Sequence, residues 1–208
     1  METNWAAENL QTIRTLMERS AVYRRALAPI MLLAGALGIA AAASGLLLHL
    51  NSSRQFDGLW LGTAVIAVVG AFFIARRQAI KDQETFWSPP TRRVALALLP
   101  PLLAGLCIGS FPMLSPAANR EFTFFSALVW IVFYGCALHA AGFFMPRGVR
   151  LFGWCFIAAG CGLFYAFLSG AISDERFSAH WLMGFFFGVL HLAYGGYLSL
   201  TGKKTPLA

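Results

Sequence analysis

Six long apolar stretches, none with an Asp, Glu, Lys or Arg, constrain the fold of this chain more than any other feature. A helix rises about 1.5 Å per residue, so each stretch is close to the length that crosses a hydrocarbon layer of about 30 Å. The 16 basic and 9 acidic residues all lie in the tails or in short connections. The sequence therefore predicts an all-α polytopic membrane protein. Its six expected transmembrane helices are Ala26–Leu50, Leu59–Ile74, Val94–Phe111, Phe122–Met145, Leu151–Ile172 and Trp181–Leu200.

The composition indicates one membrane domain and no separate soluble domain. Hydrophobic residues make up 58% and charged residues 12% of the chain, whereas about 25% of the residues of a soluble domain are charged. We expect an amphipathic cytoplasmic helix in residues 1–25, a transmembrane domain in residues 26–200 and a short cytoplasmic tail in residues 201–208. The first apolar stretch exceeds the apolar region of a cleavable signal peptide, about 7–15 residues.

The basic residues predict that both termini face the cytoplasm. With the N-terminus inside, 13 of the 16 basic residues lie on the cytoplasmic side, and each opposite connection keeps one, namely Arg54, Arg120 or Arg176. Short loops rich in Lys and Arg stay cytoplasmic. The formal charge of +7 is then a topology signal that also favours contact with anionic lipid headgroups. A nucleic-acid partner is not expected, because no folded basic face is present.

The order of the stretches favours three consecutive helical hairpins. Each odd-numbered stretch follows basic residues and then reaches a cluster of Gly and Ala, and each even-numbered stretch ends at basic residues. A threefold duplication of one hairpin would produce this pattern. Ordinary membrane helices share these features, so the pattern is also compatible with no duplication.

Small residues at four-residue spacing predict close helix packing, because positions i and i+4 share one helical face. These positions are Gly105 and Gly109, then Gly162, Ala166 and Gly170, and finally Gly184 and Gly188. We expect them to pack within the bundle. An interface with a second copy of the chain, or with another membrane protein, is the alternative.

Pro100 and Pro101 interrupt the third stretch. Neither proline can donate to the carbonyl four residues earlier, which predicts a kink. The freed carbonyls of Leu96 and Ala97 need partners, so we expect this segment to face the interior of the bundle. A kink that only sets the shape and the broken helix of a transporter both fit the pattern.

Four histidines are the main ionisable side chains near the stretches. His49 and His180 lie at the outer ends, where we expect them to reach water. His139 and His191 lie deeper, at similar depth on two parallel stretches, and are candidate functional residues. They are candidate ligands of haem b, although hydrogen bonding between helices is the simpler interpretation. No metal site is expected, because no third or fourth ligand is near.

The sequence indicates no catalytic residues, so we do not expect an enzyme. Cys107, Cys136, Cys155 and Cys161 lie inside the stretches without a Cys-x-x-Cys pair, and no hydrolase, zinc-protease or P-loop motif occurs. No carboxylate lies inside the expected spans. The usual coupling group of a proton- or sodium-driven transporter is therefore missing.

Residues 5–23 predict a helix along the cytoplasmic membrane surface. Its apolar stripe consists of Leu10, Ile13, Leu16 and Met17, and Trp5 suits an anchor at the level of the headgroups. Binding of this helix to a partner protein is the alternative.

Three segments resemble a group of uncharacterised bacterial polytopic integral membrane proteins. They are Ile13–Ser20, Leu98–Gly105 and Gly188–Gly195. The resemblance implies a location in the bacterial inner membrane, and it carries no function.

Three functions remain open at this point. The first is a non-enzymatic accessory, assembly or sensory subunit of the membrane. The second is a transporter or channel for a neutral or weakly polar solute, built around Pro100 and Pro101. The third is a membrane protein that binds haem through His139 and His191.

Overall fold

The computed structural model describes residues 26–83, 85–114, 120–172 and 178–202, and this part of the chain forms helices and no strand. The amphipathic helix expected in residues 1–25 lies outside the described residues, as does the tail from residue 203. Within the described part, six helices are long and apolar enough to cross a membrane. The prediction of a multi-pass, all-helical membrane protein is confirmed at this level.

The helices follow one another with short connections. The first helix spans Ala26–Leu47. It is followed by α2 (Ser53–Lys81), α3 (Pro89–Gly109) and the short α4 (Phe111–Leu114). Next come α5 (Arg120–Ala141) and α6 (Arg147–Leu168). The last span is built from α7 (Ala179–Met183), the π-helical segment η1 (Gly184–Val189) and α8 (Leu190–Gly202).

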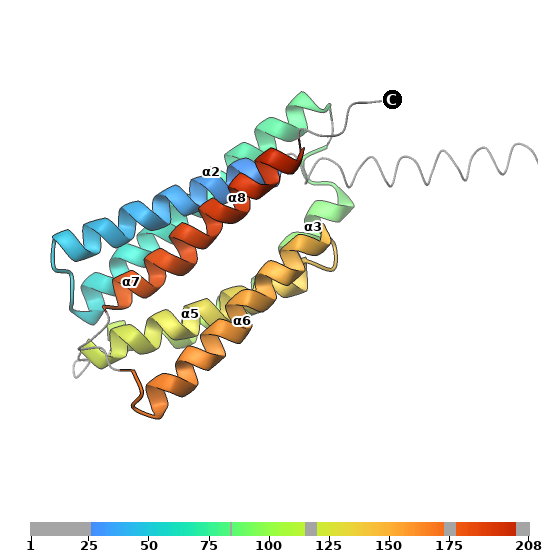
Figure 1. The fold of residues 1–208 in the computed structure, drawn as a ribbon. Helices are drawn as coiled ribbons and strands as arrows, with labels where there is room; N and C mark the ends of the chain where they lie inside the picture. The colour runs from blue at the N-terminus through green and yellow to red at the C-terminus, as the bar shows by residue number, and fades with distance from the viewer. Residues whose placement is uncertain (1–25, 84, 115–119, 173–177, 203–208) are drawn as a thin grey trace, which may run out of the picture.

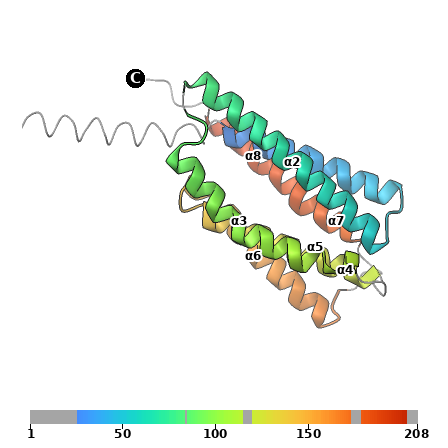
Figure 2. The same cartoon turned by 180° about the vertical axis from the view of Figure 1, so that it is seen from behind.

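The helices form two layers, which Figure 1 and Figure 2 show from opposite sides. The first helix, α2 and the last span make one layer, and α3, α5 and α6 make the other. Helix α5 is central, because it packs along α3 and α6 and also contacts α2 and α7. The first helix begins and α8 ends at the same end of the bundle, here called the terminal end (Figure 1). The connection from the first helix to α2 and the start of α7 lie at the opposite, distal end, where Leu50 contacts His180.

Glycines bring the first helix and the last span into backbone contact. A Cβ atom added to Gly38 would meet the carbonyl of Phe187, and one added to Gly184 would lie 2.6 Å from the Cβ of Ala42. Apolar side chains gain nothing by leaving lipid for each other, so close van der Waals packing of this kind holds membrane helices together. Further contacts of the same type join Gly35 to Leu192, Gly188 to Ile39 and Gly195 to Leu32.

Gly105 and Gly109 allow a similar close approach between α3 and α5. A Cβ on Gly105 would lie 2.7 Å from the Cβ of Phe133 on α5, and one on Gly109 would meet the indole of Trp130. Both glycines are buried. This face of α3 therefore lies directly against α5.

The stripe of Gly162, Ala166 and Gly170 differs from the expectation of packing within the bundle. Nothing lies within 4 Å of a Cβ added to Gly162 or Gly170. Gly162 is exposed on the outer face of α6. Gly170 has a φ of +73°, and the amide of Ala171 donates to the carbonyl of Ala166 at 2.9 Å. This is the geometry of a helix C-terminus that favours glycine, so Gly170 ends α6 and does not pack it.

Helix α3 continues through Pro100 and Pro101, and its axis bends between its two ends (Figure 2). Pro100 and Leu96 are exposed, while Ala97 and Pro101 are half-buried. The expectation that this segment faces the interior is therefore wrong for Leu96 and Pro100, whereas Ala97 and Pro101 are partly covered by the bundle. Pro100 lies on the outer side of α3, but Pro101 precedes Gly105 by four residues and so shares the face that packs against α5.

The three-hairpin arrangement and the threefold duplication stay predictions. Helix α5 packs along its neighbours on both sides in the chain, α3 and α6. Helix α6 and the last span meet through large aromatic side chains, as in the stacked pair Phe152 and Tyr194, whose ring centroids lie 4.7 Å apart. The described helix contacts thus vary in kind from one pair to the next.

Candidate functional site

His191 forms the centre of a buried polar cluster between the two layers. Its side chain is 1% exposed. Nδ1 lies 2.9 Å from the carbonyl oxygen of Phe186, and Nε2 lies 2.8 Å from the hydroxyl of Tyr134 on α5. A carbonyl only accepts, so Nδ1 carries the proton and donates, while Nε2 accepts from Tyr134. Both ring nitrogens are thus satisfied by the protein.

Aromatic rings enclose this imidazole. The ring centroids of Phe152, Tyr134 and Phe156 lie 5.2, 5.4 and 5.6 Å from that of His191, and Phe187 stacks on it at 5.9 Å. Phe156 is itself fully buried. The space between the layers at this depth is filled by side chains from α5, α6 and the last span.

The π-helical segment η1 lies directly before His191. The amide of Leu190 donates to the carbonyl of Phe185, five residues earlier. Single π-helical turns inside α-helices are rare and occur often at functional sites. Here the turn places the Phe186 carbonyl within reach of the His191 ring. No sequence signal predicts this turn, because the run Gly184–Val189 has the composition of an ordinary apolar helix.

His139 does not join His191. Its ring contacts those of Phe143 and Trp154, with centroids 5.3 and 5.2 Å away. The two α6 rings that contact His191 are Phe152 and Phe156, and Trp154 lies two residues from each of them. Two residues correspond to a rotation of about 200° around a helix. The two histidines thus contact different sides of α6. Because both nitrogens of His191 are already bonded, the described geometry does not support haem ligation by this pair.

A second buried cluster, here called the distal cluster, surrounds His180 on α7. The expectation that His180 reaches water is wrong, because its side chain is 2% exposed. The indole N–H of Trp60 donates to Nδ1 at 3.2 Å, so Nε2 carries the proton and donates to the carbonyl of Leu50 at 3.0 Å. Gly45 on the first helix leaves room for this ring, since an added Cβ would meet it.

Asp57 is the most unexpected member of the distal cluster. The sequence pattern predicted that Asp57 lies in a connection, because the apolar stretch begins at Leu59. In the structure α2 begins at Ser53, and Asp57 lies in its second turn with 0% exposure. The expectation that no carboxylate lies inside a spanning helix is therefore wrong. The detectable signal was the spacing of Phe56, Asp57 and Trp60, which places them on one helical face.

Helix α5 supplies the other wall around Asp57. The side chain of Ser126, which is fully buried, lies beside the carboxyl group. Its hydroxyl donates to the carbonyl of Phe122 at 3.0 Å. Neither carboxyl oxygen of Asp57 has a hydrogen-bond partner within the described part of the chain. The ring of Phe56 stacks on that of Trp130, at 6.1 Å between centroids, and fixes α2 against α5.

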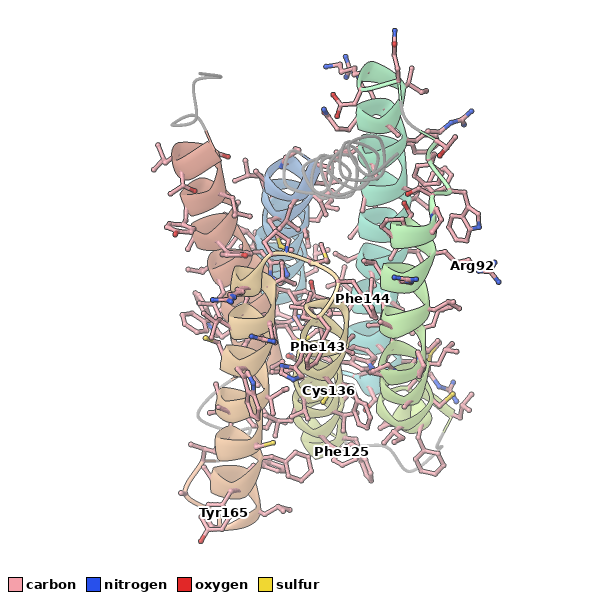
Figure 3. The ribbon with its side chains drawn as sticks, turned by 90° about the vertical axis from the view of Figure 1, so that its right-hand side faces the viewer. Arg92, Phe125, Cys136, Phe143, Phe144 and Tyr165 are labelled. Atoms are coloured by element: carbon pink, nitrogen blue, oxygen red, sulfur yellow. The ribbon has the colours of Figure 1, made fainter. Side chains whose placement is uncertain are left out.

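The cysteines and the other candidate ligands do not form a further site among the described residues. Among the described residues, no group of three or more His, Cys, Asp or Glu could hold a metal ion. Cys107, Cys155 and Cys161 are exposed and Cys136 is half-buried. In Figure 3, Tyr165 near the end of α6 and Arg92 near the start of α3 project away from the helices.

Comparisons of this chain with protein families, with curated proteins and with solved structures found no match. The six long apolar helices themselves define the class, a multi-pass helical membrane protein, and the two buried clusters are its candidate sites.

Proposed function

We propose that this chain is a non-enzymatic membrane subunit with an accessory or sensory role. The observation that carries the proposal is the filled interior around His191. Four aromatic rings surround an imidazole whose two nitrogens are already bonded, so this imidazole has no free nitrogen with which to coordinate a solute. A transporter, in contrast, needs a path lined by polar groups that are free to bind the solute.

The proposal includes a location in the bacterial inner membrane with both termini in the cytoplasm. The described basic residues favour this orientation, because they concentrate at the terminal end of the bundle and short basic loops stay cytoplasmic. Arg54 is the second residue of α2 and Arg120 the first residue of α5, both at the distal end. The basic residues on the terminal side are Arg76, Arg77, Lys81, Arg92, Arg93, Arg147 and Arg150. Contact with anionic lipid headgroups follows from the same distribution.

Purification in a mild detergent tests the accessory role. A subunit that serves a larger assembly should retain a specific membrane partner, which mass spectrometry identifies and reciprocal purification verifies. The matched test uses the protein alone in liposomes. We expect no uptake of neutral solutes and no turnover of candidate substrates. Movement of a solute by the isolated protein would contradict the proposal.

Transport is the second candidate function, and Asp57 is the observation that favours it. Ionisable residues buried within membrane helices often mark ion or proton pathways. The original expectation against ion-coupled transport depended on the absence of such a group. A solute path that reached the distal cluster would leave the filled centre around His191 intact, so liposome assays with an imposed ion gradient are needed to separate the two functions.

A further inference from the structure

We propose that Asp57 binds a small monovalent cation, either H⁺ or Na⁺, at the distal end of the bundle. The inference does not depend on the accessory or sensory role, because it concerns a binding site and not what the site controls. It starts from a carboxyl group that is 0% exposed and has no hydrogen-bond partner on either oxygen within the described residues.

An ionised carboxylate is too costly to bury in this way. Charged groups inside proteins are paired, hydrogen-bonded or bound to an ion, and a buried polar group without a partner calls for a specific explanation. No ion pair reaches the Asp57 carboxylate among the described side chains, and the Ser126 hydroxyl beside it donates to the Phe122 carbonyl instead. A bound cation removes this cost, and the proton is the smallest that can do so.

The described charged and titratable groups around Asp57 do not pair with its carboxylate. His180 on α7 is held by Trp60 and Leu50 in a geometry that fits the neutral ring. Arg54, one turn before Asp57 on α2, is exposed. Helix α4 has no titratable residue. Helix α5 begins with Arg120 and Glu121, whose side chains are outside the described set.

Oxygen atoms for a small cation are available at this end of the bundle. Ser126 lies beside the carboxyl group, and its hydroxyl keeps lone pairs free while it donates to Phe122. The buried hydroxyl of Ser110 has no partner among the described residues. Ser110 follows Gly109, which packs against Trp130, and Trp130 stacks on Phe56 directly before Asp57.

The size of the charge favours a monovalent ion. Ca²⁺ and Mg²⁺ are usually held by more than one carboxylate and by six or more oxygens, and Zn²⁺ takes three or four His, Cys, Asp or Glu. No group of three such residues occurs in the described part of the chain. One carboxylate with hydroxyl and carbonyl oxygens neutralises one positive charge.

Infrared spectroscopy of the purified protein in lipid nanodiscs tests the proposal. A protonated carboxyl gives a carbonyl stretch that shifts on exchange into deuterated water, and an ionised one gives carboxylate stretches. We expect the wild type at pH 7 to show a band that is lost in Asp57→Asn. The matched control is Asp82→Asn, at the terminal end of α2, where the Asp82 carboxylate accepts from Gln78 at 3.0 Å. This control should keep the band.

A second arm distinguishes the two cations. If Na⁺ occupies the site, the Asp57-dependent band is that of a carboxylate. The melting temperature then rises with NaCl, does not rise with choline chloride at equal ionic strength, and loses this difference in Asp57→Asn. A carboxylate band at Asp57 without sodium dependence would overturn the proposal, because the charge would then be neutralised by the protein or by water.

A measurement on the wild type covers the case in which Asp57→Asn fails to fold. An apolar carbodiimide reacts with protonated carboxyl groups in apolar surroundings, and mass spectrometry locates the modified peptide. Modification of Asp57 that falls as the pH rises supports proton binding, and protection by NaCl supports sodium binding. An Asp57 that stays unmodified at every pH, with no effect of NaCl on the melting temperature, would overturn both forms of the proposal.

Discussion

The hydroxyl of Tyr134 lies 2.8 Å from Nε2 of His191, and this hydrogen bond joins the two helix layers at the middle of the bundle. Tyr134 belongs to α5, which packs along α3 and α6, whereas His191 belongs to the last span, which packs along the first helix. The bond is buried within aromatic rings. It is therefore the polar contact whose removal reports most directly on how the layers hold together.

Replacing Tyr134 by Phe should lower the free energy of unfolding by about 0.6 kcal/mol, the average for a hydrogen bond between membrane helices. His191→Gln should cost no more than about 1 kcal/mol, since an amide also donates and accepts. A double-mutant cycle of Tyr134→Phe with His191→Phe, which removes both ring nitrogens, measures the coupling between the two residues in mixed micelles, with reversible unfolding followed by circular dichroism. His139→Gln is the control, because Nδ1 of His139 has no partner in the described structure.

The expected coupling is about the size of one such hydrogen bond. A coupling near zero would mean that the two residues act independently, contrary to the geometry. A much larger value would mean that the hydroxyl supports a wider network around His191.

An absorption spectrum tests the haem hypothesis. We expect protein purified from haem-replete cells to be colourless, because Nδ1 of His191 donates to the Phe186 carbonyl and Nε2 accepts from Tyr134. A Soret band in the wild type that is lost in His191→Gln would contradict this expectation, since an amide does not replace imidazole as an axial ligand. The same test on His139→Gln would show whether both residues are needed.

The sequence predicted the number of spans because charge inside a long apolar helix is costly and easily recognised. The same criterion led to the wrong prediction that Asp57 lies outside the spanning helix. An apolar-stretch criterion ends a span at the first charged residue, whereas the helix continues as long as its backbone hydrogen bonds do. A carboxyl group enclosed by other helices is compatible with a spanning helix, and only the fold reveals what encloses it.

The glycine positions illustrate the same limit. Four-residue spacing shows that Gly184 and Gly188 share one helical face, and the first helix lies against that face. The same spacing at Gly162 and Gly170 has a different cause, because Gly170 adopts a positive φ at the end of α6. Spacing defines a face but not the partner that covers it, and the partner depends on long-range packing.

Gly38→Ala should destabilise the protein, whereas Gly162→Ala should not. An added Cβ at Gly38 meets the backbone of Phe187 and Gly188, which cannot rotate away. Overpacking of this kind costs about 1–3 kcal/mol. The control position has nothing within 4 Å, so Gly162→Ala should not destabilise the protein, and the higher helix propensity of Ala should stabilise it by up to about 1 kcal/mol. Thermal unfolding in the same detergent compares the two variants. Equal stability of both would contradict the packing of the first helix on the last span.

Loss of stability at Gly162→Ala would carry separate information. Because this residue is exposed on α6 in the single chain, such a loss would indicate that a second protein or a second copy covers that face. Size-exclusion chromatography with light scattering, performed on both variants, distinguishes these outcomes from a simple change in helix propensity.

Cysteine labelling in intact cells tests the orientation of the bundle. Ser52 and Gln83 are both exposed and flank α2 at its opposite ends. In a background without the four native cysteines, Ser52→Cys should react with a membrane-impermeant maleimide from outside. Gln83→Cys should react only after the membrane is permeabilised, because the basic residues near it favour the cytoplasm. The reverse pattern would invert the topology and place the distal cluster, with Asp57, on the cytoplasmic side. Labelling of both sites from outside would mean that α2 does not span the membrane, which its length of 29 residues and apolar composition make the least expected result.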